Sequence, residues 1–366
     1  MTALDAVIKK QLKIKACKAR IGIVESVYHA KSGHPGGSLS IVEALTYLYK
    51  YEIRIDDPHS PDRDRLVLSK GHAVPAQYAV LAMKGMIPIS LLDTLRKIDS
   101  PLQGHPKLGS VPGIEMSTGS LGQGISVACG MALGAKINHQ KLRVYAVLGD
   151  GELQEGQVWE AIHFASHYSL NNLCLLVDWN NLQIDGYVDD VMNLRKMDDR
   201  FRANGFRTIV IDGHDFIELQ AAFSMFHQTK DRPTAVIMKT IKGKGVSYME
   251  DAVEWHGKAP NEEEYKQAIL ELDRQIQTLR RMDQEGTDVG GTETGGMALG
   301  MMDLSDPKWD SMVLDSFARN SLAQRAAAER EIQLQAEESV REMQEDAARQ
   351  RMMKLNKETV GEGESI

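Results

Sequence analysis

Short, almost wholly apolar segments recur through the middle of the chain. Four of them carry β-branched or other apolar residues at nearly every position: 143–148 (RVYAVL), 173–178 (LCLLVD), 206–212 (FRTIVID) and 234–240 (TAVIMKT). The segments between them show the apolar spacing of helices, at 155–168, 189–203 and 215–228. Strands that are apolar throughout and separated by helices are typical of a parallel sheet covered on both faces. The pattern therefore predicts an α/β fold with a doubly wound, mostly parallel sheet.

Before residue 142 the pattern is helical but is interrupted three times. Helical apolar spacing covers 10–31, 38–51, 78–85 and 125–137. The interruptions are rich in glycine and proline, at 32–38 (SGHPGGS), 68–77 (LSKGHAVPAQ) and 116–124 (MSTGSLGQG). In the first of them, the residues that exclude regular structure are Gly33, Pro35, Gly36 and Gly37.

The composition changes again past about Arg281. Residues 285–300 have the Gly, Thr and acidic content of a flexible linker. Residues 315–355 are rich in Ala, Glu, Gln and Arg and offer little apolar surface to bury. We predict a folded domain at 1–284, a linker at 285–300 and a polar tail, helical or disordered, at 301–366.

Composition and charge narrow the class of protein. The hydrophobic fraction of 42% and the charged fraction of 26% are ordinary for a globular protein. A net charge of −8 argues against a general binder of nucleic acid or anionic membranes, since those proteins carry a basic surface. No apolar run approaches the length of a membrane span, and residues 1–20 lack the features of a signal peptide. Cys17, Cys129 and Cys174 match neither a disulfide framework nor a zinc spacing, which favours a reduced, cytoplasmic enzyme.

The apolar segment 143–148 is followed by GDG, and the next one is followed by NN at 180–181. Because both follow predicted parallel strands, Asp150 and Asn180 should lie at the same edge of the sheet, where such proteins bind ligands. A carboxylate, an amide oxygen and main-chain carbonyls suit Mg²⁺, which often shares its ligands with phosphates. Gly149 and Gly151 would let backbone N–H groups approach an anion. An isolated GDG is more often a strand-end turn, but the second polar site favours a metal–phosphate site.

The GDG sequence, 28 intervening residues and NN together resemble the thiamine-diphosphate motif. Further segments resemble transketolase, in order and in spacing: KSGHPGGSLS, DRDRLVLSKGHA, GHPKLGSVPGIEMSTGSLGQGISVACGMALGAK and KTIKGKGVSYMEDAVEWHGKAP. The resemblance covers about residues 10–270. It implies the diphosphate-binding (PP-type) domain of the thiamine-diphosphate fold, with thiamine diphosphate and Mg²⁺ as cofactors.

The resemblance also implies roles for single residues at the charged end of the cofactor. The metal would be held by the Asp150 carboxylate, the Asn180 amide oxygen and the main-chain carbonyl of Leu182. The diphosphate would be contacted or neutralised by His72, Gly151, Lys242 and His256. Lys242 alone would also fit a solvated lysine after a strand, but the neighbouring Gly243 and Gly245 favour an anion site.

Other positions would meet the organic part of the cofactor and the sugar. The backbone of Gly119, Ser120 and Leu121 would contact the aminopyrimidine, although many full-length enzymes have proline in place of Ser120. The channel over the thiazolium would be lined by His34, His105 and His256, which would bind sugar hydroxyls and move protons. Histidines suit this role because ketol transfer needs groups that titrate near neutrality.

Glu155 and Glu160 have two interpretations. In the resembling family, acids at these places lie at the interface between two cofactor sites and link them by a hydrogen-bonded chain, so both are candidate catalytic residues. The alternative is a negatively charged first helical turn, which the helix macrodipole stabilises. The sequence favours the interface for Glu155 and leaves both interpretations open for Glu160.

A complete transketolase is much longer, and its second domain supplies the glutamate that acts on the aminopyrimidine. Residues 285–366 are too few and too polar to form such a domain. We therefore expect the N-terminal subunit of a split transketolase, a transferase of pentose phosphate metabolism that acts on sugar phosphates. It would need a partner subunit with the pyrimidine-binding half and would assemble as an α₂β₂ heterotetramer.

Two alternatives stay open. The first is a related ketol transferase for an unusual sugar, or an enzyme like 1-deoxyxylulose-5-phosphate synthase, against which GHPG and EWHGKAP favour transketolase. The second is a non-catalytic cofactor-binding or scaffolding homologue. The complete set of candidate ligands argues against this second alternative.

Overall fold

The computed structural model describes residues 4–281. The predicted linker at 285–300 and the polar tail at 301–366 lie outside the described residues. Within residues 4–281, no helix is long and apolar enough to cross a membrane.

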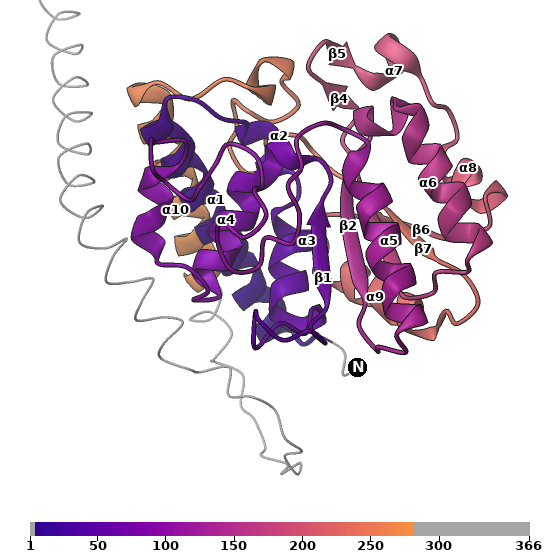
Figure 1. Ribbon diagram of the computed structural model, residues 1–366. Coiled ribbons are helices and arrows are strands. Elements are labelled where there is room, and N and C mark those ends of the chain that lie inside the picture. Colours follow the sequence, from indigo (N-terminus) through magenta and orange to yellow (C-terminus); the bar gives the residue numbers. More distant parts are fainter. Residues whose placement is uncertain (1–3, 282–366) are drawn as a thin grey trace, which may run out of the picture. The chain divides into compact units, whose positions relative to one another are not determined.

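A five-stranded parallel sheet forms the centre of the described fold (Figure 1). Its order is β1-β2-β3-β7-β6, with β1 (Arg65–Leu68), β2 (Val144–Gly149), β3 (Leu173–Trp179), β6 (Arg207–Asp212) and β7 (Thr234–Lys239). All of these pairs are parallel, and the four strands predicted from apolar runs are confirmed. The sequence did not predict β1, because this strand has only four residues and the last of them already belongs to the glycine-rich break at 68–77.

Helices cover both faces of the sheet, as the apolar strands predict. They include α5 (Gln123–Ile137), α6 (Gly156–His167) and α9 (Phe216–Gln228). On one face, Val144 and Ala146 of β2 share a buried core with residues of α5 and α6; Figure 1 shows α5 beside β2. On the other face, the ring of Tyr145 contacts Phe226 of α9 at a centroid distance of 5.8 Å. Alternate side chains of β2 therefore pack into two hydrophobic cores, one on each face of the sheet.

The N-terminal helices pack beside this sheet. The long helix α1 (Ala6–Ala30) contacts α3 (Val42–Tyr47), α4 (Val74–Met83) and α10 (Glu262–Arg281). A π-helical turn follows α3 at Leu48–Glu52, and a small antiparallel hairpin is formed by β4 (Leu182–Gln183) and β5 (Gly186–Tyr187). Short 3-10 turns lie at Gly71–Ala73, Ile89–Thr94, Gly151–Gln154 and Val253–His256.

All three predicted breaks contain helical residues, which corrects the expectation from glycine and proline content. Within 116–124, α5 begins at Gln123. Within 32–38, Pro35 begins the short helix α2 (Pro35–Leu39). Within 68–77, α4 begins at Val74 and has Pro75 in its first turn. Proline is compatible with a first turn, because the N–H that it lacks has no intrahelical partner there and its φ is already helical.

The prediction of one helix at 189–203 is also corrected, because the structure has two separate helices there. They are α7 (Val188–Met192) and α8 (Met197–Ala203). Between them, Arg195 and Lys196 have positive φ angles of 43° and 33°, which interrupt a right-handed helix.

Candidate active site

The predicted site residues gather where four neighbouring strands end. His72 follows β1, Asp150 follows β2, Asn180 follows β3, and Lys242 follows β7. Carboxyl ends of parallel strands share one edge of the sheet, the usual ligand edge of α/β proteins. The backbone N–H of Asn181 donates a hydrogen bond of 2.5 Å to the Asp150 carboxylate. The loops that follow β2 and β3 are therefore in contact.

Asp150 is a buried carboxylate that lacks a full counter-charge. Its side chain accepts hydrogen bonds from Gly151 N (2.8 Å) and Asn181 N (2.5 Å), and the residue is 2% exposed. Burial, and then repulsion from Asp178, raise the pKa of Asp150 to about 7, although the two backbone bonds and Lys242 oppose the shift. A bound cation would offset the cost of holding this charge in the interior.

The other two predicted metal ligands present oxygens in the same region. Asn180 Nδ2 donates to Asp178 (2.9 Å), which fixes the amide so that Oδ1 faces Leu182 N at 3.0 Å. The carbonyl of Leu182 accepts a hydrogen bond from Lys242 Nζ at 2.9 Å. Residues 4–281 hold no group of three His, Cys, Asp or Glu side chains suited to a metal. A metal here would thus need amide and main-chain oxygens beside Asp150, a set that fits Mg²⁺.

Four histidines form a cluster next to these oxygens. The histidine cluster consists of His34, His72, His105 and His256. The ring of His34 is central, with centroids 5.5 Å from His72 and 5.7 Å from both of the others. The structure therefore brings together residues that the sequence places in four separate segments.

Burial changes the protonation of the histidine cluster from the expectation. It lowers the pKa of His34 to about 4, with Arg96 as the next cause, and the pKa of His256 to about 3, with Lys242 next. The pKa values of His72 and His105 are lowered by burial as well. The lowered pKa values keep these side chains neutral imidazoles at pH 7, each with one donor and one acceptor nitrogen. The expectation of groups that titrate near neutrality is corrected accordingly.

Lys242 is buried at the inner end of the site. Its ammonium contacts Leu182 O and His256 Nδ1, both at 2.9 Å, and the residue is 2% exposed. Burial, and then Lys70, lower the pKa of Lys242 to about 8, so the side chain is still mostly charged at neutral pH. Gly243 has φ +79°, and a Cβ there would lie 2.0 Å from Met249 O. Only glycine therefore allows the turn that follows Lys242.

Of the three backbone positions assigned to the aminopyrimidine, Gly119 lies beside the histidine cluster. Gly119 has φ +142°, and a Cβ there would lie 3.1 Å from Cγ of His105. Ser120 is exposed, whereas Gly119 and Leu121 are half-buried. The segment thus places peptide groups next to His105 with no side chain between them.

Glu155 and Glu160 lie outside the histidine cluster. Glu155 is exposed, immediately precedes α6 and makes no capping hydrogen bond with its side chain. It lies against Gly122, where an added Cβ would be 2.9 Å from the Cβ of Glu155. Glu160 is exposed in the second turn of α6, so the first-turn interpretation does not describe it. Their role at an interface stays a prediction.

Two buried carboxylates that the sequence analysis did not single out hold the site loops together. Glu152 accepts hydrogen bonds from Ser69 Oγ (2.5 Å), Gly122 N (2.9 Å) and Gly149 N (3.1 Å). It therefore joins the SKGH, SLGQG and GDG loops. The second carboxylate belongs to Asp178, the last residue of the apolar run 173–178. An ionisable residue at the end of an apolar strand, on the edge of the sheet that binds ligands, was the sequence signal that could have identified Asp178.

Asp178 is fully buried and has polar partners from four segments. The Asp178 network consists of Asp178, Ser40 (2.6 Å), Lys70 (2.5 Å), Asn180 (2.9 Å) and Thr240. Although burial opposes it, the Lys70 ammonium holds the pKa of Asp178 below its usual range. Asn180 is itself a predicted metal ligand, Lys70 is two residues from His72, and Thr240 is two residues from Lys242. The network therefore anchors three of the loops that carry the site.

Replacing Lys70 with methionine should destabilise the protein strongly. The change leaves the Asp178 carboxylate buried without its counter-ion, which typically costs about 3–5 kcal/mol. Urea denaturation would measure the loss. Arg232→Met is the control, because Arg232 forms an exposed pair with Asp231 and should change stability by less than about 1 kcal/mol. Equal effects of the two substitutions would contradict the importance of the buried pair.

Arg96 adds a permanent cation at the outer side of the histidine cluster. Its guanidinium donates to Ser32 Oγ (2.9 Å) and lies 3.3 Å from His34 Nδ1. Its buried Nε has no hydrogen-bond partner among the described residues. Nothing in the local sequence distinguished this arginine from a surface one.

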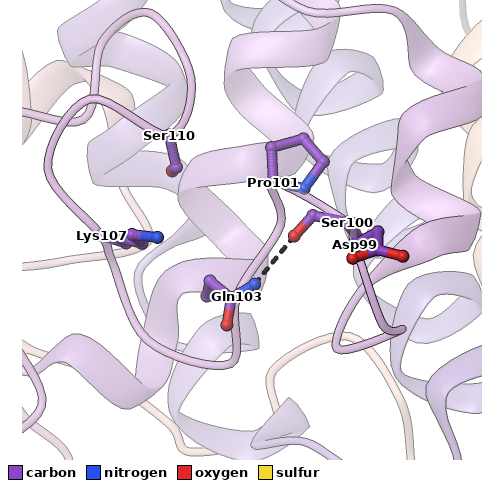
Figure 2. Close-up of a pocket in the computed structure, with 6 residues that line it drawn as sticks. All are labelled: Asp99, Ser100, Pro101, Gln103, Lys107 and Ser110. Atoms are coloured by element: carbon purple, nitrogen blue, oxygen red, sulfur yellow. Dashed lines mark hydrogen bonds between the residues drawn. The ribbon is translucent and has the colours of Figure 1, made fainter.

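A cavity of about 420 Å³ lies on the loop that carries His105 (Figure 2). Its lining is polar and consists of Asp99, Ser100, Pro101, Gln103, Lys107 and Ser110. Gln103 Nε2 donates to Ser100 O at 2.8 Å across it. None of the predicted site residues lines this cavity, although it flanks His105 on both sides in the sequence.

These observations define an α/β protein with a candidate metal and diphosphate site at the carboxyl edge of a parallel sheet. Residues 11–278 match the family described as "Transketolase, thiamine diphosphate binding domain". The chain belongs to this family, whose transketolase members are transferases.

Individual relatives fall into two groups by length. The chain is 42% identical over 272 residues to one subunit of the apulose-4-phosphate transketolase of Phocaeicola vulgatus, covering 74% of this chain and 96% of the relative. It is 45% identical over 246 residues to the 6-deoxy-6-sulfo-D-fructose transketolase subunit SqwG of a Clostridium species, covering 66% and 89%. With human transketolase it shares 43% identity over 277 residues, which cover 74% of this chain but 43% of the human one.

Solved structures give the same relation. Transketolase from Campylobacter jejuni matches with a TM-score of 0.67 at 30% identity, covering 86% of this chain and 50% of that chain. The chain therefore spans about half the length of the long transketolases and nearly all of the two subunit relatives.

Proposed function

We propose that this chain is the thiamine diphosphate-binding subunit of a two-subunit transketolase. It would transfer a two-carbon ketol unit from a ketose phosphate to an aldose acceptor, with thiamine diphosphate and Mg²⁺. The observation that carries the proposal is the meeting of Asp150, Lys242 and the histidine cluster at one sheet edge. The lengths of the two subunit relatives support a split enzyme.

At the charged end, this chain's residues would bind and orient the cofactor. Asp150, Asn180 Oδ1 and Leu182 O would hold the metal, while Lys242 and His72 would face the diphosphate. The N–H of Gly151 donates to Asp150, and the missing side chain of this glycine would let the diphosphate approach its backbone closely. Thiamine diphosphate, when bound, would supply a thiazolium ring whose C2 becomes, on losing its proton, the nucleophile toward the ketose.

At the sugar end, the neutral imidazoles of His34 and His105 would do the proton chemistry. A neutral imidazole can donate a hydrogen bond to one hydroxyl oxygen and accept a proton from another. Arg96 beside His34 would attract an anionic group of the sugar. The subunit relatives are named for a phosphorylated and a sulfonated ketose, which favours donors with such an anionic group.

In transketolases, the glutamate that acts on the aminopyrimidine comes from the pyrimidine-binding domain. In the proposed enzyme, the partner subunit would supply it. We propose an α₂β₂ assembly with Glu155 and the loop around Gly122 near the subunit boundary, because the two are in contact and Glu155 is exposed. A cytoplasmic location stays a prediction from the sequence.

The test compares the purified chain with and without the pyrimidine-half subunit encoded in the same genome. Thiamine diphosphate, Mg²⁺, a ketose phosphate and an aldose acceptor are supplied in both cases. We expect no ketol transfer by the chain alone and turnover by the mixture. Robust turnover by the chain alone would refute the two-subunit proposal. No turnover with the cognate partner over a broad panel of sugar phosphates and sulfonates would favour the non-catalytic alternative.

A further inference from the structure

The Lys242 ammonium contacts the same carbonyl oxygen that is proposed to bind the metal. Its Nζ donates to Leu182 O at 2.9 Å and lies 2.9 Å from His256 Nδ1. Its positive charge also acts on the buried Asp150 carboxylate. The Lys242 side chain thus places a positive charge on the oxygen set, although this charge compensates the buried Asp150 carboxylate only in part.

The stem of Lys242 is held tightly, so the position of its ammonium is a property of the fold. A Cβ on Gly36 would lie 3.1 Å from Cγ of Lys242, which shows that the two are packed together. The backbone on both sides is fixed as well, because Gly243 N donates to Gly36 O (3.0 Å) and Asp251 N donates to Lys242 O (2.9 Å). Only the outer bonds of the side chain are left to redirect the ammonium.

We propose that Lys242 is a resident counter-cation that the metal displaces from Leu182 O, so that metal and diphosphate bind as a coupled pair. The proposal rests on the metal and diphosphate site of the proposed function. A divalent ion on Leu182 O would repel an ammonium that stays on the same oxygen, and burial strengthens this repulsion. The displaced ammonium needs a new anionic partner, because an unpaired charge is costly in the interior.

The diphosphate would provide that partner. The metal alone would then bind weakly, because it would leave the Lys242 ammonium buried without an acceptor. With diphosphate present, the ammonium would turn from Leu182 O to phosphate oxygen, and the metal would bind more tightly. By linkage, the metal would raise diphosphate affinity by the same factor. Lys242 thereby favours occupation of the site by both components over occupation by a lone divalent ion.

The test measures the binding of Mn²⁺ alone to the full chain at pH 7.5, from the electron paramagnetic resonance signal of free Mn²⁺. Lys242→Met should bind Mn²⁺ more tightly than the wild type, by about tenfold or more, because the competing charge is gone. Lys242→Arg keeps the charge and should bind as weakly as the wild type. Lys244→Met is the matched control, since Lys244 is partly exposed and pairs with Glu250. Thermal unfolding of each variant verifies folding, and Lys242→Gln is a second neutral variant.

A second measurement adds inorganic pyrophosphate, with correction for the Mn²⁺–pyrophosphate complex in solution. Pyrophosphate should tighten Mn²⁺ binding in the wild type, and this coupling should fall in Lys242→Met. If folded Lys242→Met or Lys242→Gln binds Mn²⁺ no more tightly than the wild type, the proposal is wrong. Neither measurement uses a sugar or a partner chain, so failure of ketol transfer and failure of this inference can be told apart.

Discussion

Replacing Asp150 with alanine should abolish Mg²⁺-dependent binding of thiamine diphosphate. Asp150 is the buried carboxylate at the end of β2, and its raised pKa shows that the fold lacks a full counter-charge there. Without it, a divalent ion would lose its one charged ligand. We expect affinity to fall by roughly 10²- to 10³-fold, the scale of losing one partner of a buried charge pair. Calorimetric titration of the assembled protein with thiamine diphosphate, with Mg²⁺ and with EDTA, would measure it.

Two further substitutions sharpen this experiment. Asp150→Asn keeps the shape of the side chain and an oxygen that can accept a backbone hydrogen bond, so its loss of affinity isolates the charge. Asp185→Ala removes an exposed carboxylate in the turn between β4 and β5 and should bind the cofactor like the wild type. Equal thiamine diphosphate affinity in the wild type and Asp150→Ala would contradict the assignment of Asp150 as a metal ligand.

Alanine at His34 or His105 should lower turnover while thiamine diphosphate affinity stays nearly intact. His34 is central in the histidine cluster and has contacts with His105 and Arg96, on the sugar side. Loss of a positioned proton-transfer group typically costs about 10²- to 10⁴-fold in rate. Steady-state kinetics of the two-subunit protein, beside cofactor titration, would separate the two effects.

His139→Ala is the control, because His139 is an exposed residue after α5 and should change neither quantity. Combining His34→Ala with His105→Ala should cost less than the sum of the single free-energy effects if both act on the same proton transfer. Weakened cofactor binding without a separate kinetic defect would place the two residues at the cofactor and not at the sugar.

The sheet could be predicted because β2, β3 and β7 are buried along almost their whole length, so their sequences are apolar at nearly every position. The edge strand β6 alternates buried and exposed residues, but its apolar residues Ile209, Val210 and Ile211 still indicate a strand. β1 escaped prediction because its four residues are too few for a pattern, and its place at the sheet is set by pairing with β2. The helix α10 was not distinguished either. Its buried residues Ala268, Ile269, Leu272 and Ile276 recur at helical spacing on an otherwise charged segment, a pattern that would have indicated an amphipathic helix.

The site was predictable where function requires a recognisable local sequence. The histidine cluster comes from loops in which histidine stands close to glycine or proline, and the structure brings all four together. Lys70, Glu152 and Asp178 were missed because their roles lie in tertiary hydrogen bonds. The lowered pKa values of His34 and His256 were missed for the same reason, since burial and nearby cations cause them.

The Asp178 network joins segments that are distant in the chain. Ser40, Lys70 and Thr240 are 138, 108 and 62 positions from Asp178. Contacts at such separations form only after long loops have closed, so no short fragment contains a working version of the site. During synthesis, Asp150 and Asn180 leave the ribosome after Ser40 and Lys70 but about 60 residues or more before Thr240, the last member of the network. Cofactor affinity should therefore appear only after the chain beyond Thr240 has emerged and joined the sheet.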